Sequence, residues 1–226
     1  MLKCQFHCHA FGDPVDFINY SPKELIDEAA RLKYDVISIT CHRKRLFNKD
    51  LEKYAKDKGI LLIPGIEFEI NKQHILGINV DKEIEKVNSF EKLKKYRESH
   101  PNCFIIAPHP YFPEKCVLGK NLEKHIDLFD GIENSFCYTS TINFNKKAIK
   151  IAKKYKKPLI ATADCHILSY LNIAYVKINA KKDVKSIFKA LKKGNFKNHT
   201  KATSYFKIAR MIIQISLQNM FKKKLG

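Results

Sequence analysis

Short apolar runs alternate along the chain with longer segments of helical periodicity. Each apolar run is bounded by polar or chain-breaking residues, which is typical of strands covered on both faces. We predict strands at residues 5–9, 35–40, 60–64, 103–107, 131–133, 159–162 and 174–178. Because strands and helices take turns over this length, the pattern predicts an α/β fold with a parallel sheet closed into a barrel. A doubly wound open sheet is the alternative, but no Gly-rich phosphate loop follows the first strand.

Helical patterns fill the gaps between the predicted strands. Ser21-Pro22-Lys23-Glu24 combines a capping box with Pro at the first helical position, and therefore predicts a helix start. Further helices are predicted at residues 48–58, 81–98, 142–155 and 183–193. Residues 67–70 and 75–80 flank Asn71-Lys72, which indicates a hairpin rather than a crossover.

The last segment of the chain has a different pattern. Within residues 202–224, apolar residues recur at steps of three and four. The set comprises Phe206, Ala209, Ile213, Leu217 and Met220, widened by Ile208, Met211, Ile212 and Ile215. We predict a basic amphipathic helix that packs on the barrel or on a second subunit, which would make a homo-oligomer; an interfacial membrane helix is the alternative. The chain is accordingly divided into a barrel domain, residues 1–195, and a C-terminal helical extension, residues 196–226.

The charge balance adds a candidate partner. The chain has 42 Lys and Arg against 23 Asp and Glu, a formal net charge of +19. Residues 181–226 hold thirteen of the basic residues and a single acidic one, Asp183. Such a basic segment attracts polyanions, so nucleic acid is a candidate partner of the C-terminal segment, and a lysine-rich solvated surface is the simpler interpretation.

Other features of the composition bear on the cellular compartment in which the protein is expected. The chain has no long apolar run, so we predict no membrane span. The seven cysteines form no CxxC pair, and an odd count suits thiols in a reducing compartment. Because the first residues also lack the pattern of a signal peptide, we expect a cytoplasmic protein.

Side chains with metal-binding chemistry follow the predicted strands. His7 and His9 form a His-x-His pair, and alternate residues of a strand point to the same side. Further candidates lie at or just after later strand ends or in the hairpin, namely His42, Glu67, His74, His109, Asp164 and His166. Barrel enzymes build their active sites at this end of the strands. Imidazoles combined with carboxylates suit manganese, zinc or iron, and two such ions can bind a phosphoryl oxygen and generate a hydroxide nucleophile.

Five motifs carry a family resemblance. In order, they are His7-Cys8-His9, Thr40-Cys41-His42, Pro64-Gly65-Ile66-Glu67, Ala107-Pro108-His109-Pro110 and Asp164-Cys165-His166. Together they resemble the PHP (polymerase and histidinol phosphatase) family over about residues 1–195. The resemblance implies a distorted TIM-like (β/α)7 barrel that holds two or three divalent metal ions.

The resemblance also implies roles for individual residues. His7, His9, Glu67 and Asp164 would hold the first ion. Glu67 would bridge to a second ion completed by His74 and His109, and Glu67, His109 and Asp164 would be the catalytic residues. His42, His166 and a loop carboxylate would hold a third ion.

Two positions depart from the family pattern. Cys41 stands where the family usually has Asp, from which we expect altered tuning rather than loss of metal. The loop carboxylate is displaced, since Asp13 lies four residues after His9 where five is commoner. We expect Asp13 to be the ligand and Asp16, seven residues after His9, to be a surface residue.

The family's usual activity is phosphoester hydrolysis. We therefore expect a phosphatase that hydrolyses a phosphate monoester of a small metabolite or nucleotide through a metal-bound hydroxide. Arg43, Lys44 and Arg45 are candidates for binding the phosphate, and Asn134 is a candidate for lining the pocket. The alternatives are an exonuclease on short DNA or RNA, and a non-catalytic RNA-binding barrel like the PHP-like protein subunit of ribonuclease P.

Overall fold

The strands of the protein form one mixed sheet. The computed structural model describes residues 1–225, and side-chain environments for residues 1–220, so Gly226, the end of the predicted extension, lies outside the described residues. Within this range the strand order is β7-β6-β5-β4-β3-β2-β1-β8-β9. The strands are β1 (Leu2–Gln5), β2 (Val36–Ile39), β3 (Leu61–Ile70), β4 (Gln73–Ile78), β5 (Phe104–Ala107), β6 (Gly131–Ser135), β7 (Leu159–Thr162), β8 (Tyr175–Ile178) and β9 (Phe196–His199).

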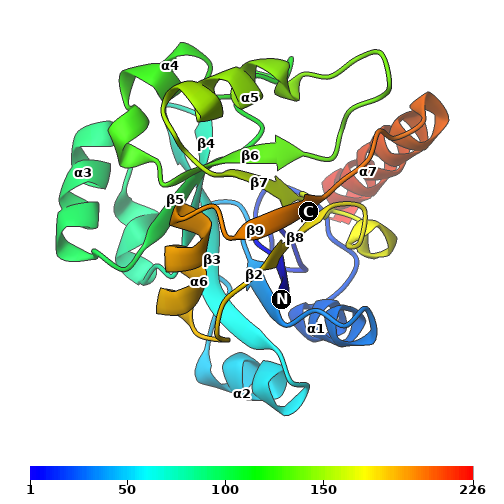
Figure 1. Ribbon diagram of the computed structural model, residues 1–226. Coiled ribbons are helices and arrows are strands. Elements are labelled where there is room, and N and C mark those ends of the chain that lie inside the picture. The colour runs from blue at the N-terminus through cyan, green and yellow to red at the C-terminus, as the bar shows by residue number, and fades with distance from the viewer. Residues whose placement is uncertain (226) are drawn as a thin grey trace.

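Helices lie around the outside of this sheet (Figure 1). The α-helices are α1 (Pro22–Arg31), α2 (Lys49–Asp57), α3 (Phe90–Ser99), α4 (Lys120–Lys124), α5 (Asn145–Lys154), α6 (Val184–Lys192) and α7 (Tyr205–Leu225). Short 3-10 helices are η1 (Lys82–Lys86), η2 (Ile126–Leu128) and η3 (Leu168–Tyr170). The predicted capping box at Ser21 is confirmed, because its side chain accepts a hydrogen bond from the Glu24 backbone N–H and the Glu24 carboxylate accepts one from the Ser21 backbone N–H.

The sheet is nearly closed into a barrel. β1, β2 and β3 pair in parallel, as do β5, β6 and β7. Backbone bonds from His9 to Cys165 (3.0 Å) and from Cys165 to His7 (3.2 Å) join the segments that follow β1 and β7. The side chain of Asn198 in β9 bonds the β7 backbone at Ala161 and Leu159, at 2.8 and 2.7 Å. The predicted barrel is therefore confirmed, but its sheet is mixed rather than parallel, since β4, β8 and β9 run antiparallel to their neighbours.

One apolar cluster shows how far the sheet curls. It contains side chains from β1, β5, β7 and β8, including the fully buried Cys4, Phe104, Ile160 and Val176, and Ile187 of α6 joins it. Strands that are distant in the sheet order can share one cluster only when the sheet wraps around it. This packed interior supports the polar groups that follow the strand ends.

The C-terminal segment differs from the prediction. Residues 196–199 form β9, because Phe196 pairs with Ile178 at the edge of the sheet, so the barrel extends past residue 195. The helix of the extension, α7, begins only at Tyr205. The predicted helix at residues 81–98 is likewise divided into η1 and α3, since the Ser89 side chain caps the start of α3.

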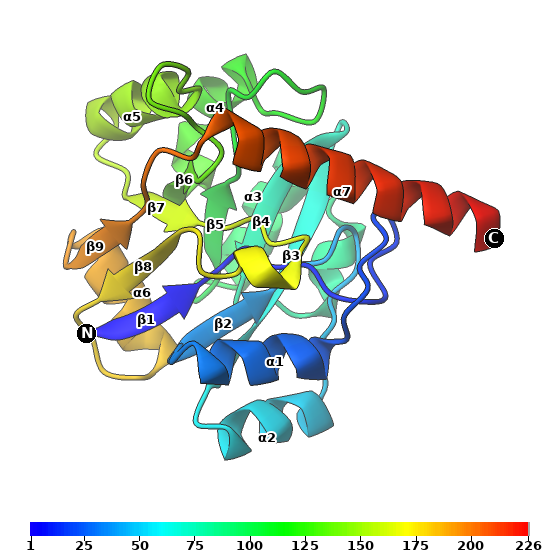
Figure 2. The same ribbon diagram turned by 90° about the vertical axis from the view of Figure 1, so that its right-hand side faces the viewer.

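The helix α7 packs on the barrel with only part of the predicted apolar face. Phe206, Ile213 and Leu217 of the predicted stripe are 77%, 59% and 50% exposed. Met211 is only 9% exposed, and it packs with the half-buried Ile215 in one cluster with Phe136. Figure 2 shows α7 running past the ends of the strands rather than along their outer faces. Packing on a second subunit stays a prediction, and none of the helices within residues 1–225 is long and apolar enough to cross a bilayer.

The Asn198 bridge generates a prediction about barrel closure. Asn198→Ala removes two hydrogen bonds to the β7 backbone, so we expect the free energy of unfolding to fall by about 1–3 kcal/mol. Denaturant titration measures this change, and the exposed neighbour Lys197→Ala is the matched control. An equal loss in both variants would show that the bridge does not hold the barrel closed.

Candidate metal centre

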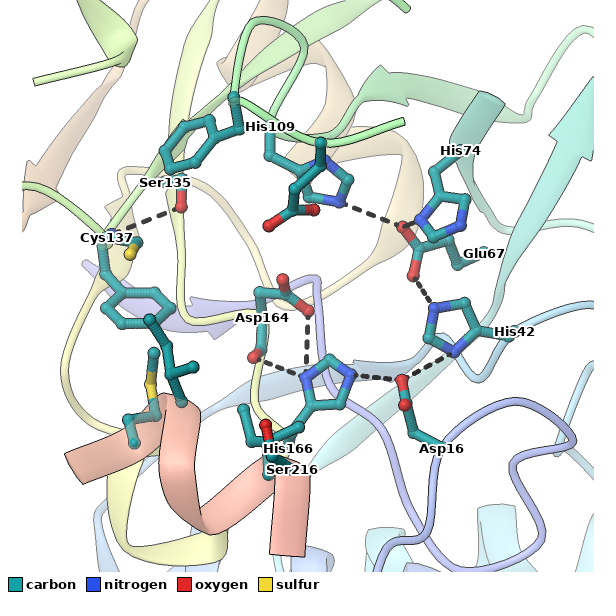
Figure 3. Close-up of a pocket in the computed structure, with 16 residues that line it drawn as sticks. Asp16, His42, Glu67, His74, His109, Ser135, Cys137, Asp164, His166 and Ser216 are labelled. Carbon is teal, nitrogen blue, oxygen red and sulfur yellow. Dashed lines mark hydrogen bonds and ion pairs between the residues drawn. The ribbon is translucent and has the colours of Figure 1, made fainter. Parts of the chain in front are cut away.

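The predicted histidine and carboxylate ligands converge at one place. They lie past the C-terminal ends of β1, β2, β5 and β7, within β3 and at the start of β4 (Figure 3). The ring centroid of His9 lies 4.0 Å from that of His166 and 4.5 Å from that of His42. The centroids of His42 and His74 are 5.0 Å apart. Residues from remote parts of the chain therefore share one small volume.

The backbone at two strand ends is adapted to this placement. His109 after β5 and Asp164 after β7 have φ angles of 27° and 44°, which non-glycine residues rarely adopt. Such a conformation costs of order 1–3 kcal/mol and is typical of functional sites. The Glu133 carboxylate helps to hold it, since its Oε2 accepts a hydrogen bond from the His109 backbone N–H at 2.6 Å.

Glu67 lies at the centre of the cluster. Its Oε1 is 2.9 Å from His74 Nδ1 and 3.4 Å from His109 Nε2. Its Oε2 is 3.3 Å from His7 Nε2 and 3.2 Å from His42 Nε2. The side chain is 1% exposed. A carboxylate with imidazoles facing each oxygen has the arrangement needed to bridge two cations.

Asp164 gathers a second set of imidazoles. Its Oδ1 lies 3.2 Å from His7 Nε2, 3.3 Å from His9 Nε2 and 3.4 Å from His166 Nδ1. The side chains form overlapping groups whose ligand atoms lie within 4.8 Å of one another: His7, His9 and Asp164; His9, His42 and His166; and His42, Glu67 and His74. Shared members make this one connected centre.

Unsatisfied polar atoms show that the centre fits divalent cations. Within the described residues, five buried atoms of the cluster make no hydrogen bond, namely His9 Nε2, Glu67 Oε1, His74 Nδ1, His109 Nδ1 and Asp164 Oδ1. Four of them face each other in ion pairs, His74 Nδ1 with Glu67 Oε1 at 2.9 Å and His9 Nε2 with Asp164 Oδ1 at 3.3 Å. Each such atom costs about 1–3 kcal/mol when it stays unpaired. Histidine nitrogens and carboxylate oxygens are ligands of zinc, manganese and iron. The residues present therefore suit divalent metals, as the sequence predicts.

Two carboxylates orient the His7 and His9 imidazoles through contacts at Nδ1, the ring nitrogen that does not face Asp164. Glu133 Oε1 lies 2.8 Å from His7 Nδ1 and also accepts a bond from the Thr162 hydroxyl. Asp13 Oδ2 lies 2.9 Å from His9 Nδ1. A carboxylate at Nδ1 fixes the tautomer of an imidazole and turns its Nε2 lone pair toward the metal. Sequence analysis missed this role of Glu133, although an acidic residue at the end of a buried strand is a usable signal.

The two loop carboxylates lie in different surroundings, although both approach His42. Asp13 Oδ2 lies 3.0 Å from His42 Nδ1. Asp13 is buried, and it accepts bonds from the backbone of Val15, Asp16 and His42 as well as from His9. Its oxygens are thus occupied by the protein. Asp16 instead faces the cavity, with Oδ2 at 3.1 Å from His166 Nε2 and 3.7 Å from His42 Nδ1. The geometry favours Asp16 as the carboxylate of the third group.

Charge pairing shifts the pKa values of the cluster. Burial alone would raise the pKa of Glu67, but the neighbouring His7, His42 and His74 hold it well below its usual range. Burial alone would lower the pKa of His74, but Glu67 raises it to about 11. Burial likewise opposes protonation of His166, whose pKa Asp164 and Asp16 raise to about 9. Protonated histidines therefore supply the positive charge beside these carboxylates that bound metal ions would otherwise supply.

Comparison with known proteins shows what this chain is similar to. Residues 143–196 match the family model described as PHP-associated. The fold is similar to a two-domain protein from Bacteroides vulgatus containing a predicted PHP-like metal-dependent phosphoesterase, with a TM-score of 0.68, 18% identity, and coverage of 95% of this chain and 69% of that one. It is also similar to the lesion-specific endonuclease EndoQ from Pyrococcus furiosus, with a TM-score of 0.65, 16% identity, and coverage of 87% of this chain and 57% of that one.

The chain therefore has the fold of PHP-like proteins. A sequence relative is the uncharacterized protein MJ1587 of Methanocaldococcus jannaschii. It is 28% identical over 124 residues, which span 54% of this chain and 68% of that protein.

A cavity of about 350 Å³ opens above the candidate metal centre. Its walls come from the loops after β5 and β6, through Phe112 and Phe136, and from α7, through Met211 and Ile215. The side chains that line it within the described residues include no Lys or Arg. The cavity thus combines a floor of imidazoles and carboxylates with apolar walls.

The predicted phosphate-binding residues lie outside this cavity. The Arg43 side chain is 60% exposed and pairs with Glu69, at 2.8 Å between Nε and Oε1. Lys44 is exposed, and the Arg45 guanidinium lies over the Phe47 ring at 5.3 Å. Asn134 is not among the lining residues, whereas the next residue of β6, Ser135, is. The role of these residues in phosphate binding stays a prediction, and strand alternation separates Asn134 from Ser135.

Cys41, which stands where the PHP family usually has Asp, is an uncharged packing residue. It is fully buried in an apolar cluster, and its sulfur accepts a bond from the Ala10 N–H at 3.3 Å. Burial raises the pKa of this thiol, with the nearby Asp13 acting in the same direction. Any effect of Cys41 on a bound metal ion would therefore arise because the negative charge of an Asp is missing at this position.

The orienting role of Glu133 can be tested by removing its charge. Glu133→Gln weakens its hold on both His7 and the His109 backbone, so we expect metal affinity to fall about 10–100-fold with the fold retained. Calorimetric titration with Mn²⁺ or Zn²⁺ measures the change. Glu123→Gln, which alters contacts with Lys154 and Tyr155 away from the cluster, is the control. Unchanged affinity in Glu133→Gln would rule out the orienting role.

The raised histidine pKa values predict a pH dependence of metal binding. Metal needs neutral imidazoles, so binding must release the protons held by His74 and His166 below their pKa values of about 11 and about 9. Affinity should therefore rise with pH, by about tenfold per unit for each proton released. Titrations between about pH 6 and about pH 8, in buffers of different ionisation enthalpy, count the protons. Affinity that is constant or falls over this range would contradict the assignment.

Proposed function

We propose that the protein is a metal-dependent phosphoesterase that hydrolyses a phosphate monoester of a small metabolite or nucleotide. The observation that carries this proposal is the buried Glu67 carboxylate, with imidazoles facing both oxygens, at the floor of a 350 Å³ cavity. Two cations sharing such a carboxylate are suited to the two oxygens of an in-line phosphoryl displacement. The fold it shares with PHP-like proteins agrees with the same class of reaction.

The side chains would have different roles in such a site. Bound divalent ions would supply the activation of water and the neutralisation of phosphoryl oxygens. Glu67 would fix the spacing of the ligand groups, and Asp164 would tie His7 and His9 to His166. His109 lines the cavity, and its Nε2, 3.4 Å from Glu67 Oε1, would complete the second ligand group with His74. Phe112, Phe136 and Met211 would exclude bulk water from the ester.

A nuclease activity is the second candidate. EndoQ shares the fold, and one of its structures holds a 27-mer duplex with an abasic lesion at the active site. Nucleic-acid binding depends on Lys and Arg contacts to phosphates, however, and the cavity walls of the described chain present none. The helix α7 also occupies one side of the cavity. Both observations favour a small substrate over a polynucleotide.

A non-catalytic RNA-binding barrel is the third candidate from the sequence. A pure binder would gain nothing from the buried, unpaired His and carboxylate atoms of the metal centre, which cost stability. The basic residues of the C-terminal segment keep nucleic acid as a candidate partner. The cytoplasmic location stays a prediction.

Substitution of the central ligands tests the proposed function. We expect Asp164→Ala and His9→Ala to lower turnover of phosphate monoesters by roughly 10²–10⁴-fold, because each removes a ligand that faces other imidazoles or carboxylates. Circular dichroism should show the fold retained. The assay uses Mn²⁺, Zn²⁺ or Fe²⁺ with a panel of phosphorylated metabolites and nucleotides, and chelator should abolish the activity.

Arg43→Ala is the matched control, because Arg43 lies outside the cavity and pairs with Glu69. Its turnover and KM should equal those of the unmodified protein. Full activity in Asp164→Ala would refute the proposed site. Activity on oligonucleotides alone would replace the phosphatase by a nuclease.

A further inference from the structure

We propose that α7 is the specificity wall of the active-site cavity, and that it selects phosphate esters whose organic group is an apolar ring. This inference rests on the proposed phosphoesterase function and adds the class of its substrate. The predictions for the C-terminal segment were packing on the barrel or a second subunit, with a membrane-surface helix as the alternative, and contact with nucleic acid. The metal ligands lie on other elements.

The helix is attached to the barrel along its length. Before its first turn, the Thr203 N–H donates to the Tyr138 carbonyl at 2.7 Å. Near its middle, Met211 is buried against Phe136. Farther along, Asn219 Nδ2 donates to Asp16 Oδ1 at 2.6 Å.

The same Asn219 also accepts from the loop after β1, since the Phe17 N–H donates to its Oδ1 at 2.8 Å. Attachment at the loop after β6 and at the loop after β1 places the helix across the rim of the cavity. Figure 3 shows this placement, with Ser216 of the helix beside His166. The position of α7 is therefore determined by contacts with the site itself.

The wall that α7 builds is mostly apolar. Met211, Ile212 and Ile215 come from the helix, and Phe112 and Phe136 come from the barrel loops. Ser135 and Ser216 add hydroxyl groups to this wall. Apolar side chains on two sides of a cavity favour a ring that can be buried between them, because burial of apolar area provides the binding free energy.

Charge in the cavity selects against highly polar organic groups. The protein has a formal net charge of +19, yet the lining residues of the described chain include no Lys or Arg. Glu114, Asp16 and Asp164 do line the cavity. A second phosphate or a carboxylate on the substrate would find no Lys or Arg there and would be repelled by Glu114. Such exclusion gives specificity as effectively as attraction does.

Cavity size sets the upper limit. A volume of about 350 Å³ is near the lower end of small-molecule sites, which run from roughly 300 to 1,000 Å³. It suits a phosphoryl group with a single ring and leaves no room for an oligonucleotide. The geometry therefore points to phenyl-like phosphates rather than polyol phosphates.

Binding of non-hydrolysable probes tests the wall separately from turnover. With Mn²⁺ or Zn²⁺ present, calorimetry compares phenylphosphonate with methylphosphonate, which share the metal-binding head. We expect the full-length protein to bind phenylphosphonate at least about tenfold more tightly, which is about 1.4 kcal/mol. Equal affinities, or no binding of either probe, would overturn the proposal.

Variants of α7 locate the preference. Ile215→Ser should lower the ratio of the two affinities at least about threefold, since it places a hydroxyl in the apolar wall. Met211→Leu keeps the wall apolar and should keep the ratio, whereas Met211→Ser should lower it. Ile213→Ser is the matched control, because Ile213 is 59% exposed on the same helix and does not line the cavity. A ratio that is unchanged in both serine variants of the wall would overturn the proposal.

Kinetics separate the two proposals. The specificity constant kcat/KM for phenyl phosphate should exceed that for glycerol phosphate in the same direction as the phosphonate ratio. Hydrolysis of both esters without preference would leave the phosphoesterase standing and remove the specificity wall. A retained phosphonate preference without hydrolysis of any ester would remove the phosphoesterase and leave the wall.

Discussion

The structure depends on the burial of several carboxylates and imidazoles in one place. Glu67 is 1% exposed, and its oxygens meet imidazoles within 2.9–3.4 Å on both sides. In the absence of metal, only protons can balance this charge, which explains the pKa of about 11 at His74. Divalent cations would satisfy the same groups better, because they also engage the atoms that have no hydrogen-bond partner. The barrel brings the groups together, since the ends of its strands meet at one rim.

The surroundings of the centre determine what it can accept. Glu133 and Asp13 hold two of the imidazoles from behind, so the ligand geometry is supported by groups that never face the cavity. On the open side, α7 adds Met211 and Ile215 to the aromatic residues of the loops. The result is a polar floor below apolar walls. Chemistry and substrate selection are thereby assigned to different elements, with the barrel providing the ligands and the C-terminal helix providing much of the wall.

The ligand positions could be predicted from the sequence because strand ends are local patterns and parallel strands share an edge. His7, His109 and Asp164 each follow a short apolar run, and the hairpin at Asn71-Lys72 follows from its flanking strands. Features set by tertiary contacts could not be predicted in this way. Two apolar stripes on α7 compete, and only the position of Phe136 decides that Met211 is the buried one. Asp13 and Asp16 differ in sequence by spacing alone, and only the folded loop shows that the backbone occupies Asp13.

Anomalous X-ray diffraction from crystals grown with Mn²⁺ or Zn²⁺ is the most direct test of the central claim. The account predicts at least two anomalous peaks within the cluster, separated by about 3.5–4 Å and bridged by Glu67. His7, His9 and Asp164 should lie around one peak, and His74 and His109 around the other. Crystals with full metal in the solution but no peak beside Glu67 would contradict the claim that these buried groups exist to hold metal ions.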